Sequence, residues 1–256
     1  MSRFDGLIPR ERTKQPEGVK TALMVGEQAT GGGLSLLMAK ALKAMGAGGP
    51  TSFEQTGWFQ GPEGKWRREI DDSGARFENG RLVHPDLEKA YPGILKDIPM
   101  EITNSLPEGT TGGYDPSSAS VLVAEDLDDP MPTALHEYQH AIQAIEGFAR
   151  GSYSGDPDLI EQTTDLLKRA PNDDDMAEAY YDTGGEMESF GIEQRIGMSP
   201  KERRAQYPWE AYSPVNFMEP IILGQDAQPM KYEDTGLAKI LMRALGREKT
   251  PKDWGY

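Results

Sequence analysis

The chain has 256 residues, of which 37% are hydrophobic and 27% charged, and its formal net charge is -15. This acidic balance argues against a nucleic-acid surface, which needs clustered lysine and arginine, and no apolar run approaches the ~20 residues that span a bilayer. The sequence contains no cysteine, which excludes disulfides, thiolate catalysis and cysteine-ligated metals, so any metal must bind histidine, aspartate or glutamate.

Residues 1–20 are polar and contain prolines, and Thr21–Val25 is a brief apolar run; we predict that residues 1–30 form an arm ahead of the folded domain. The arm begins without the apolar core of a secretory signal, so we expect no signal peptide. Gly31–Gly33 then opens the helical pattern Leu34–Met45. A glycine-rich turn before a helix can cradle phosphate, but the Lys-Ser/Thr pair of a phosphate loop is missing, which favours a plain loop and helix start.

Two strands joined by a turn are predicted where Thr56–Gln60 and Lys65–Ile70 flank Gly61–Gly64. Their aromatic residues are expected to lie in the core or the sheet rather than in a binding site. His84 is followed directly by Pro85, and an ordinary surface or core position is the default for such a histidine.

The next stretch alternates short helical and extended patterns. Leu87–Leu95 predicts a short helix interrupted at Pro92, and Ile98–Ile102 predicts a strand. Thr110–Pro116 is strongly turn-forming. Ala119–Leu127 is a strong strand candidate, and a strand at this point could pair with an extended peptide substrate. An ordinary interior strand explains the same pattern equally well.

A helix predicted to begin at the capping candidate Thr133 and to stop at Gly147 or Gly151 contains the pattern His136-Glu137-x-x-His140. Residues four apart stack on one face of a helix, so both imidazoles can reach a single ion. An apolar stripe at helical spacing supports the helix and lies on a different side from the histidines and Gln143. Its members are Leu135, Tyr138, Ile142 and Ile145.

Two neutral imidazoles suit Zn²⁺, and a catalytic zinc site keeps one position open for water. Glu137 is turned roughly 100° from His136 on the helical wheel, so it can contact that water and take its proton rather than bind the metal. A water held in this way is acidified toward a pKa of ~7 and becomes a nucleophile at neutral pH. The pattern therefore predicts a zinc site with Glu137 as general base.

Beyond this helix, Leu159–Ala170 predicts an amphipathic helix, Pro171–Asp175 a turn and Met176–Ile196 one long helix. The three consecutive aspartates of the turn lack a calcium-loop spacing and fit a solvated loop or a helix cap. Prolines punctuate residues 198–256, which we predict to be an extension ending in a helix at Glu233–Leu245.

A hydrolytic zinc site requires a third protein ligand. Glu186 is the best candidate, because Gly184 and Gly185 beside it would let that helix pack close to the helix of the two histidines. Other acidic residues of the same region remain open as alternatives. They are Glu188 first, then Glu178 and Asp182.

Several further segments carry a more specific pattern. They are TGWFQGPEGKWRREI at 56–70, HPDLEKAYPGIL at 84–95, GGYDP at 112–116, ALHEYQHAIQAIEGFARG at 134–151, and Tyr180 with GEMES and Arg195. In residues and order, over about residues 45–197, they resemble the zincin-like metallopeptidase domains of large polyvalent proteins from bacteriophages and mobile elements.

The resemblance implies an α+β, zincin-like fold, with a twisted, mainly antiparallel sheet packed on the motif helix and a second ligand-bearing helix. It also implies that Glu186 completes the zinc site. The family often has arginine where this chain has Phe190, which leaves Tyr180 and Arg195 as candidates to stabilise an oxyanion. The metallopeptidase domain would then span residues 31–197.

Together these observations predict a phage- or prophage-encoded zinc metallopeptidase that acts on a peptide or protein. Zn²⁺ would be held by His136, His140 and Glu186, with Glu137 moving the proton. The alternative is a non-enzymatic virion or interaction protein that retains a zincin fold and contacts other virion proteins. We expect the protein in the host cytoplasm or the virion, with neither nucleic acid nor membrane as a partner.

Overall fold

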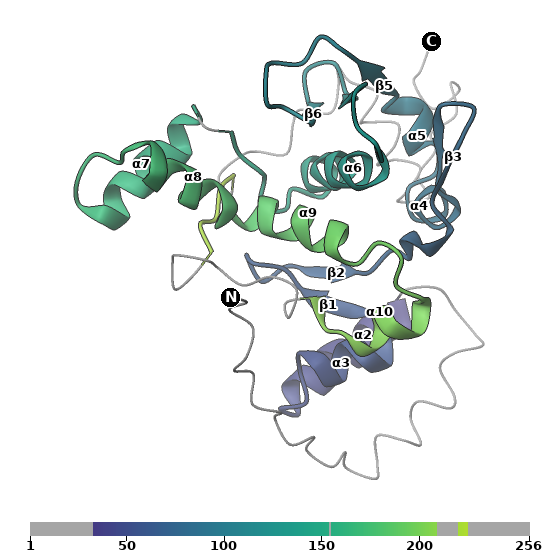
Figure 1. The fold of residues 1–256 in the computed structure, drawn as a ribbon. Coiled ribbons are helices and arrows are strands. Elements are labelled where there is room, and N and C mark those ends of the chain that lie inside the picture. The colour runs from purple at the N-terminus through teal and green to yellow at the C-terminus, as the bar shows by residue number, and fades with distance from the viewer. Residues whose placement is uncertain (1–32, 154, 209–219, 225–256) are drawn as a thin grey trace, which may run out of the picture.

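The computed structural model describes residues 33–153, 155–208 and 220–224, which form a mixed α+β fold of small sheets and several helices (Figure 1). The helices are α2 (Gly33–Ala44), α3 (Pro50–Thr56), α4 (Pro85–Ala90), α5 (Ile94–Asp97), α6 (Met131–Glu146), α7 (Pro157–Leu167), α8 (Asp173–Tyr181), α9 (Gly184–Gln194) and α10 (Pro200–Ala205). The strands are β1 (Trp58–Gln60), β2 (Trp66–Arg68), β3 (Arg76–Glu78), β4 (Arg81–Val83), β5 (Met100–Thr103), β6 (Gly112–Asp115) and β7 (Ser120–Ala124), with a 3-10 turn at Asp72–Gly74. The predicted arm of residues 1–30 and the predicted helix Glu233–Leu245 lie outside the described residues.

The described strands form three small sheets instead of one twisted sheet. Strands β1 and β2 pair antiparallel, β3 and β4 do the same, and β5, β7 and β6 form a third sheet in that order. In the third sheet β7 is central, parallel to β5 and antiparallel to β6. The 3-10 turn lies in the chain between the two hairpins, and α4 and α5 lie between β4 and β5. The predicted strand at 119–127 is thus interior, and a peptide cannot pair with β7.

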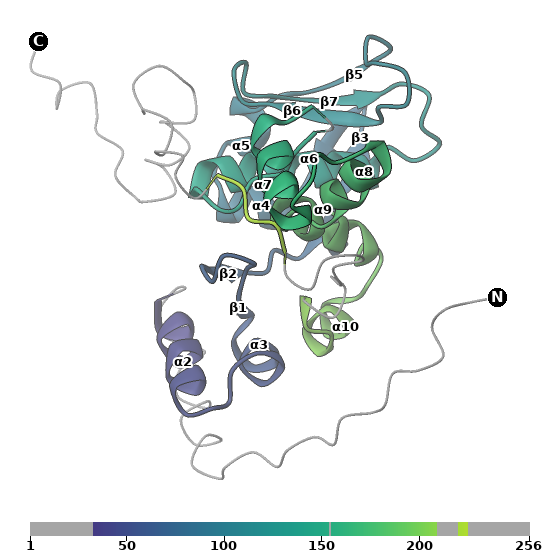
Figure 2. The same ribbon diagram turned by 90° about the vertical axis from the view of Figure 1, so that its left-hand side faces the viewer.

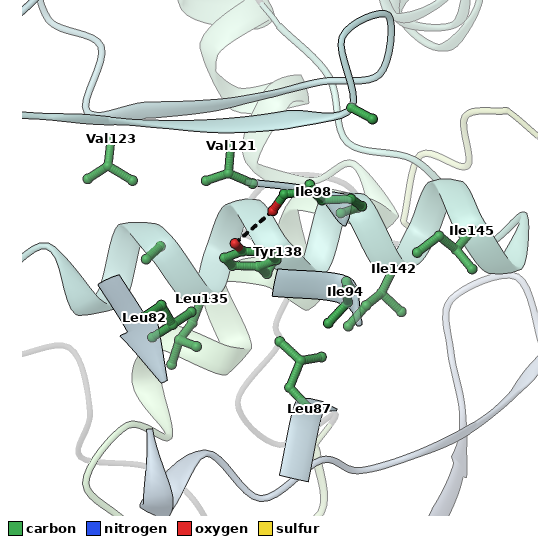
Figure 3. Packing of buried hydrophobic residues seen from close by; sticks show 13 residues of the cluster. Leu82, Leu87, Ile94, Ile98, Val121, Val123, Leu135, Tyr138, Ile142 and Ile145 are labelled. Carbon is green, nitrogen blue, oxygen red and sulfur yellow. Dashed lines mark hydrogen bonds between the residues drawn. The ribbon is translucent and has the colours of Figure 1, made fainter. Parts of the chain in front are cut away.

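Helix α6 lies between the three-stranded sheet and α9 (Figures 1 and 2). The alternation of β7 turns Val121 and Val123 toward α6, where both are fully buried against the apolar stripe of the helix (Figure 3). Complete burial of such a side chain contributes about 1.5–3 kcal/mol. Tyr138 of the stripe donates its hydroxyl hydrogen to the carbonyl of Ile98 at 2.9 Å, so its buried polar atom has a partner.

The ends of α6 follow local rules. The helix begins at Met131, two residues before the predicted cap Thr133, because the Asp129 carboxylate accepts the backbone N–H of Met131. The predicted stop at Gly147 is confirmed: it adopts the left-handed conformation, with φ 63°, that glycine tolerates best. The apolar stripe and the histidines therefore point where the spacing predicts.

The predicted long helix Met176–Ile196 is two helices. Helix α8 ends at Tyr181 and α9 begins at Gly184, because residue 221 pairs with the chain between them. The N–H of Ile221 donates to the carbonyl of Asp182, and Gly184 donates to the carbonyl of Ile221, both at 2.8 Å. These hydrogen bonds replace helical ones, so the chain changes direction and α9 runs along α6 (Figure 1).

Strand β6 forms where the sequence indicates a turn. It pairs with β7 from Gly112↔Val123 to Asp115↔Ser120 and is an edge of its sheet. A Cβ on Gly112 would overlap the Thr133 side chain and lie 3.1 Å from Glu137 Cγ. Glycine thus allows this edge strand to approach the motif helix, a tertiary requirement that turn statistics do not reveal.

Other local predictions are confirmed. The hairpin pairs Trp58 with Arg68, and the Phe59 and Phe53 rings pack edge to face at 5.8 Å, so these aromatics are core residues. The interruption at Pro92 separates α4 from α5. Asn172 caps α8, and the aspartates behind it form the first turn of that helix, where negative charge is favourable. Among the described residues, no helix combines the length and apolarity needed to cross a membrane.

Candidate metal centre

Packing of α9 against α6 brings two imidazoles and one carboxylate together. His136 Nε2 lies 3.1 Å from Glu186 Oε2, and His140 Nε2 lies 3.3 Å from Glu186 Oε1. One donor atom from each residue lies within 4.8 Å of the other two, and all three side chains are largely buried. Within the described ranges, this is the group of histidine and acidic residues that can hold a metal ion.

Glycines make this approach possible. A Cβ on Gly185 would overlap the backbone at Arg150 and Gly151, the loop that follows α6. A Cβ on Gly151 would in turn lie 2.7 Å from His140 Nδ1 and closer still to Glu186 Oε1. The backbone N–H of Ser152 donates to Glu186 Oε1 at 2.9 Å. The predicted reason for the two glycines differs from what the structure has: Gly185 meets the loop after α6, and a Cβ on Gly184 would lie 2.7 Å from Pro62 Cγ, so the nearest neighbours of both lie outside α6.

The outer nitrogen of each imidazole also has an acceptor. His136 Nδ1 lies 2.6 Å from Glu193 Oε1, and His140 Nδ1 lies 2.9 Å from Gln143 Oε1. Such partners hold the proton on Nδ1 and leave the Nε2 lone pair for a metal, the usual arrangement around metal-binding histidines. The donor set, two imidazole nitrogens and one carboxylate, is one that zinc adopts in hydrolytic sites. The residues present therefore fit the metal.

The electrostatics of the three groups are coupled. Burial alone would lower the pKa of His136, but its hydrogen bonds with Glu186 and Glu193 outweigh burial and raise the pKa to about 10. Burial alone would raise the pKa of Glu186, yet the two imidazoles hold it well below its ordinary value. A divalent cation bound here would replace protons on the imidazoles, so metal binding would release protons.

Glu137 is buried beside the triad without belonging to it. Its carboxylate accepts the backbone N–H of Tyr114 in the edge strand β6, and burial raises its pKa above the ordinary value against the opposing pull of His140 and His136. A buried carboxylate that lies close to the two imidazoles and is raised in pKa has the properties of a proton carrier.

Tyr180 and Phe190 border the triad. The Tyr180 hydroxyl forms a hydrogen bond with Glu186, and burial together with that carboxylate raises the pKa of Tyr180 well above its usual range. The Phe190 ring packs edge to face on the His136 ring at 4.8 Å and also contacts Tyr181. At this position, where the zincin-like domains that the sequence resembles often have arginine, the chain has an apolar contact to an imidazole of the triad.

Comparison with known proteins connects another part of the chain to a family. Residues 22–78 match Large polyvalent protein associated domain 23. This match supports the expected relation to polyvalent proteins, but it covers well under half of the chain and ends before α6, so it carries no information on a metallopeptidase. No curated protein and no solved structure matches the chain significantly.

The other predicted ligands are not brought to the imidazoles. Glu188 is buried next to Arg67, with its Oε1 2.5 Å from the arginine Nε. Arg67 belongs to the region that matches the polyvalent domain. Glu178 is exposed on α8, and Asp182 is buried at the break between α8 and α9. Glu186 is the acid that joins the two histidines.

Arg195 and His84 contact other groups. Arg195 lies on the side of α9 away from Glu186, pairs with Glu69 and donates to the carbonyl of Arg203 at 2.8 Å. This geometry does not support an oxyanion role for Arg195, because its described partners are not at the triad. His84 caps α4 by accepting the backbone N–H of Leu87 at 3.2 Å, the structural role expected by default.

Sequence reasoning did not identify Glu193 as a site residue. It follows Glu186 by seven positions, two helical turns, and therefore lies on the same face of α9 toward His136. That spacing is a usable signal once Glu186 is taken as a ligand. A search that stops at three metal ligands overlooks it.

Proposed function

We propose that this chain is a zinc-dependent peptidase. The observation that carries the proposal is the convergence of His136, His140 and Glu186, whose donor atoms lie within 4.8 Å of one another. The buried Glu137 beside them supplies the proton carrier that a hydrolytic site requires in addition to a metal.

When bound, a zinc ion supplies Lewis-acid chemistry, polarising a carbonyl and acidifying water. Glu137 takes the proton that the attacking water loses and returns it to the leaving nitrogen of the peptide. Its raised pKa suits both halves of this transfer, because an acid with a pKa nearer to the working pH both gains and gives up a proton more readily.

Tyr180 supports the same reaction. Because its pKa lies well above the usual range, its hydroxyl keeps the proton and can donate a hydrogen bond to negative charge that develops on the carbonyl oxygen. In the structure the single hydroxyl hydrogen is donated to the Glu186 carboxylate, and it would turn to the oxyanion once a metal ion occupies that carboxylate. Tyr180 is therefore our candidate for stabilising the oxyanion, in preference to Arg195.

The edge strand β6 supports a peptide as substrate. Among the described strands it pairs with β7 alone, and its residues Gly112 and Tyr114 lie against Glu137, whose carboxylate accepts the Tyr114 N–H. An extended peptide that adds to a free strand edge gains backbone hydrogen bonds without requiring a particular sequence. We therefore assign the pairing with a peptide substrate to β6 rather than to the predicted strand at 119–127.

The test combines metal analysis with cleavage. Purified protein should contain one zinc per chain, and Glu186→Gln should reduce this content. Cleavage of fluorescein-labelled casein should disappear in Glu137→Gln while its zinc content is retained. Zinc binding without cleavage of casein or of a peptide library would instead favour the non-enzymatic protein with a zincin fold. The match of residues 22–78 supports a polyvalent-protein context for either outcome, in a host cytoplasm or a virion.

A further inference from the structure

Behind His140, away from Glu186, lies a chain of buried polar groups that the proposed reaction does not use. Gln143 is only 1% exposed, and its Oε1 faces His140 Nδ1 at 2.9 Å. Its Nε2 donates to the carbonyl of Gly185 at 2.9 Å and lies 3.3 Å from Glu188 Oε2. One amide therefore joins a metal-binding imidazole to two acceptors on α9.

These two acceptors determine how the amide is oriented. A backbone carbonyl and a carboxylate accept hydrogen bonds, so the side of the Gln143 amide that faces Gly185 and Glu188 must be its NH₂ group. The opposite side, facing His140, must then be the oxygen. An oxygen can only accept, so Nδ1 of His140 must carry a hydrogen. Nε2 then faces Glu186, where a metal ion would take the place of a proton and use the Nε2 lone pair.

The Glu188 carboxylate is itself held by Arg67 of strand β2. The guanidinium Nε lies 2.5 Å from Glu188 Oε1, its Nη2 lies 2.9 Å from both oxygens of Glu63, and its plane covers the Phe148 ring at 3.8 Å. A Cβ on Gly61 would overlap the guanidinium, so glycine leaves the space that Arg67 occupies. Both charged partners, Glu188 and Arg67, are almost fully buried.

We propose that Gln143 is a positioning residue that selects the Nδ1–H tautomer of His140, and that the Arg67–Glu188 ion pair holds Gln143 in the required orientation. This inference rests on the metal centre of the proposed function and not on peptide cleavage. It gives the part of the chain that matches the polyvalent domain a role, because Arg67, Glu63 and Gly61 within residues 22–78 support a ligand of the metal.

The first measurement requires only the wild-type protein. In the zinc-loaded protein, the Nδ1–H of His140 should be hydrogen-bonded and protected from solvent. It should therefore give a slowly exchanging proton signal, which long-range ¹H–¹⁵N spectra assign to Nδ1. A His140 ring with an exposed or absent Nδ1–H overturns the inference. This outcome does not depend on whether any variant folds.

The second measurement is the affinity for zinc, from competition with a chromophoric chelator. Gln143→Met keeps the length of the side chain and removes its contacts with His140, Gly185 and Glu188. It should weaken zinc binding by about 10–100-fold, as other changes to groups behind metal-binding histidines do. It should also abolish the slow Nδ1–H signal. The matched control, Gln194→Met, makes the same change at an exposed position of α9 and should retain both properties.

Arg67→Met tests the outer part of the network. It should weaken zinc binding in the same direction but by less than Gln143→Met, because the carbonyl of Gly185 still orients the amide. A folded Gln143→Met protein with wild-type zinc affinity overturns the inference even if the wild type cleaves peptides. If Gln143→Met binds zinc more weakly than the wild type but the wild type cleaves no peptide, the inference stands and the proposed peptidase function is overturned instead. A wild type that binds no zinc overturns both.

Discussion

Replacing Gly151 with alanine tests the metal centre without removing any ligand. The added Cβ would lie 2.7 Å from His140 Nδ1 and closer still to Glu186 Oε1. The φ angle of Gly151 is outside the left-handed region, so alanine is compatible with the backbone and the effect comes from the methyl group alone. We expect this single methyl group to separate two of the three donors.

The magnitude follows from the distances. Ordinary contacts of a Cβ begin near 3.4 Å, so His140 Nδ1 at 2.7 Å must move by roughly 0.7 Å. Zinc sites tolerate deviations of only about 0.2 Å in their ligand distances. The loop cannot move away, because its backbone at Arg150 and Gly151 already contacts Gly185 on the other side. We therefore expect the ligands to be displaced and zinc affinity to fall by at least ~100-fold.

Competition between the protein and a chromophoric zinc chelator measures this effect. Gly155→Ala is the matched control, because its Cβ would make only an ordinary contact with the Tyr153 ring at 3.4 Å, in the same loop. Circular dichroism should confirm that both variants are folded. Wild-type zinc affinity in a folded Gly151→Ala protein would refute the assignment of His140 and Glu186 as ligands of one ion.

Three further outcomes are expected. Glu193→Gln should weaken zinc binding by ~10–100-fold, measured by the same competition, because it removes the charge that orients His136. Tyr138→Phe leaves the carbonyl of Ile98 without its donor and should lower the free energy of unfolding by about 1–3 kcal/mol in urea titrations. Hydrogen bonds from Ser117 and Ser118 lower the pKa of Asp115 to about 2, so its contribution to stability should persist above its ordinary pKa and disappear as pH falls toward 2. NMR titration of the Asp115 carboxylate measures this pKa directly, and a value near 4 would contradict it.

The part of the site that sequence reasoning predicted is the part governed by helical spacing. His136 and His140 share a face because they lie four residues apart, and the stripe of Leu135 and Tyr138 fixes which face is buried. Glu186 was selected over Glu188 because of the glycines beside it, and the structure brings Glu186 to the histidines while Glu188 pairs with Arg67. Helical spacing was enough to place the two imidazoles on one face, whereas the glycines beside Glu186 meet Pro62 and the loop after α6, which no local pattern indicates.

The features that sequence reasoning missed depend on residues far apart in the chain. The break before Gly184 requires Ile221, which no local pattern connects to α8. The segment with Gly112 and Gly113, which has a turn-forming composition, is strand β6 in the structure. Its backbone at Gly112 lies so close to Thr133 and Glu137 of α6 that a side chain would not fit there. A helical wheel alone leaves the partner of Arg195 open, and that partner, Glu69, precedes it by more than a hundred residues. In each of these three places the local structure depends on a contact with a residue far away in the sequence.

The pairing of residue 221 bears on where the functional unit ends. The same short segment bonds to Gly184 at the start of α9 and, through the carbonyl of Leu223, to the N–H of Arg150 at 3.2 Å. It therefore fastens the helix that carries Glu186 to the loop that carries Gly151. A fragment trimmed to residues 31–197 would keep His136, His140 and Glu186 but lose the hydrogen bonds that join α9 to the loop after α6. A recombinant protein should therefore include residues 220–224.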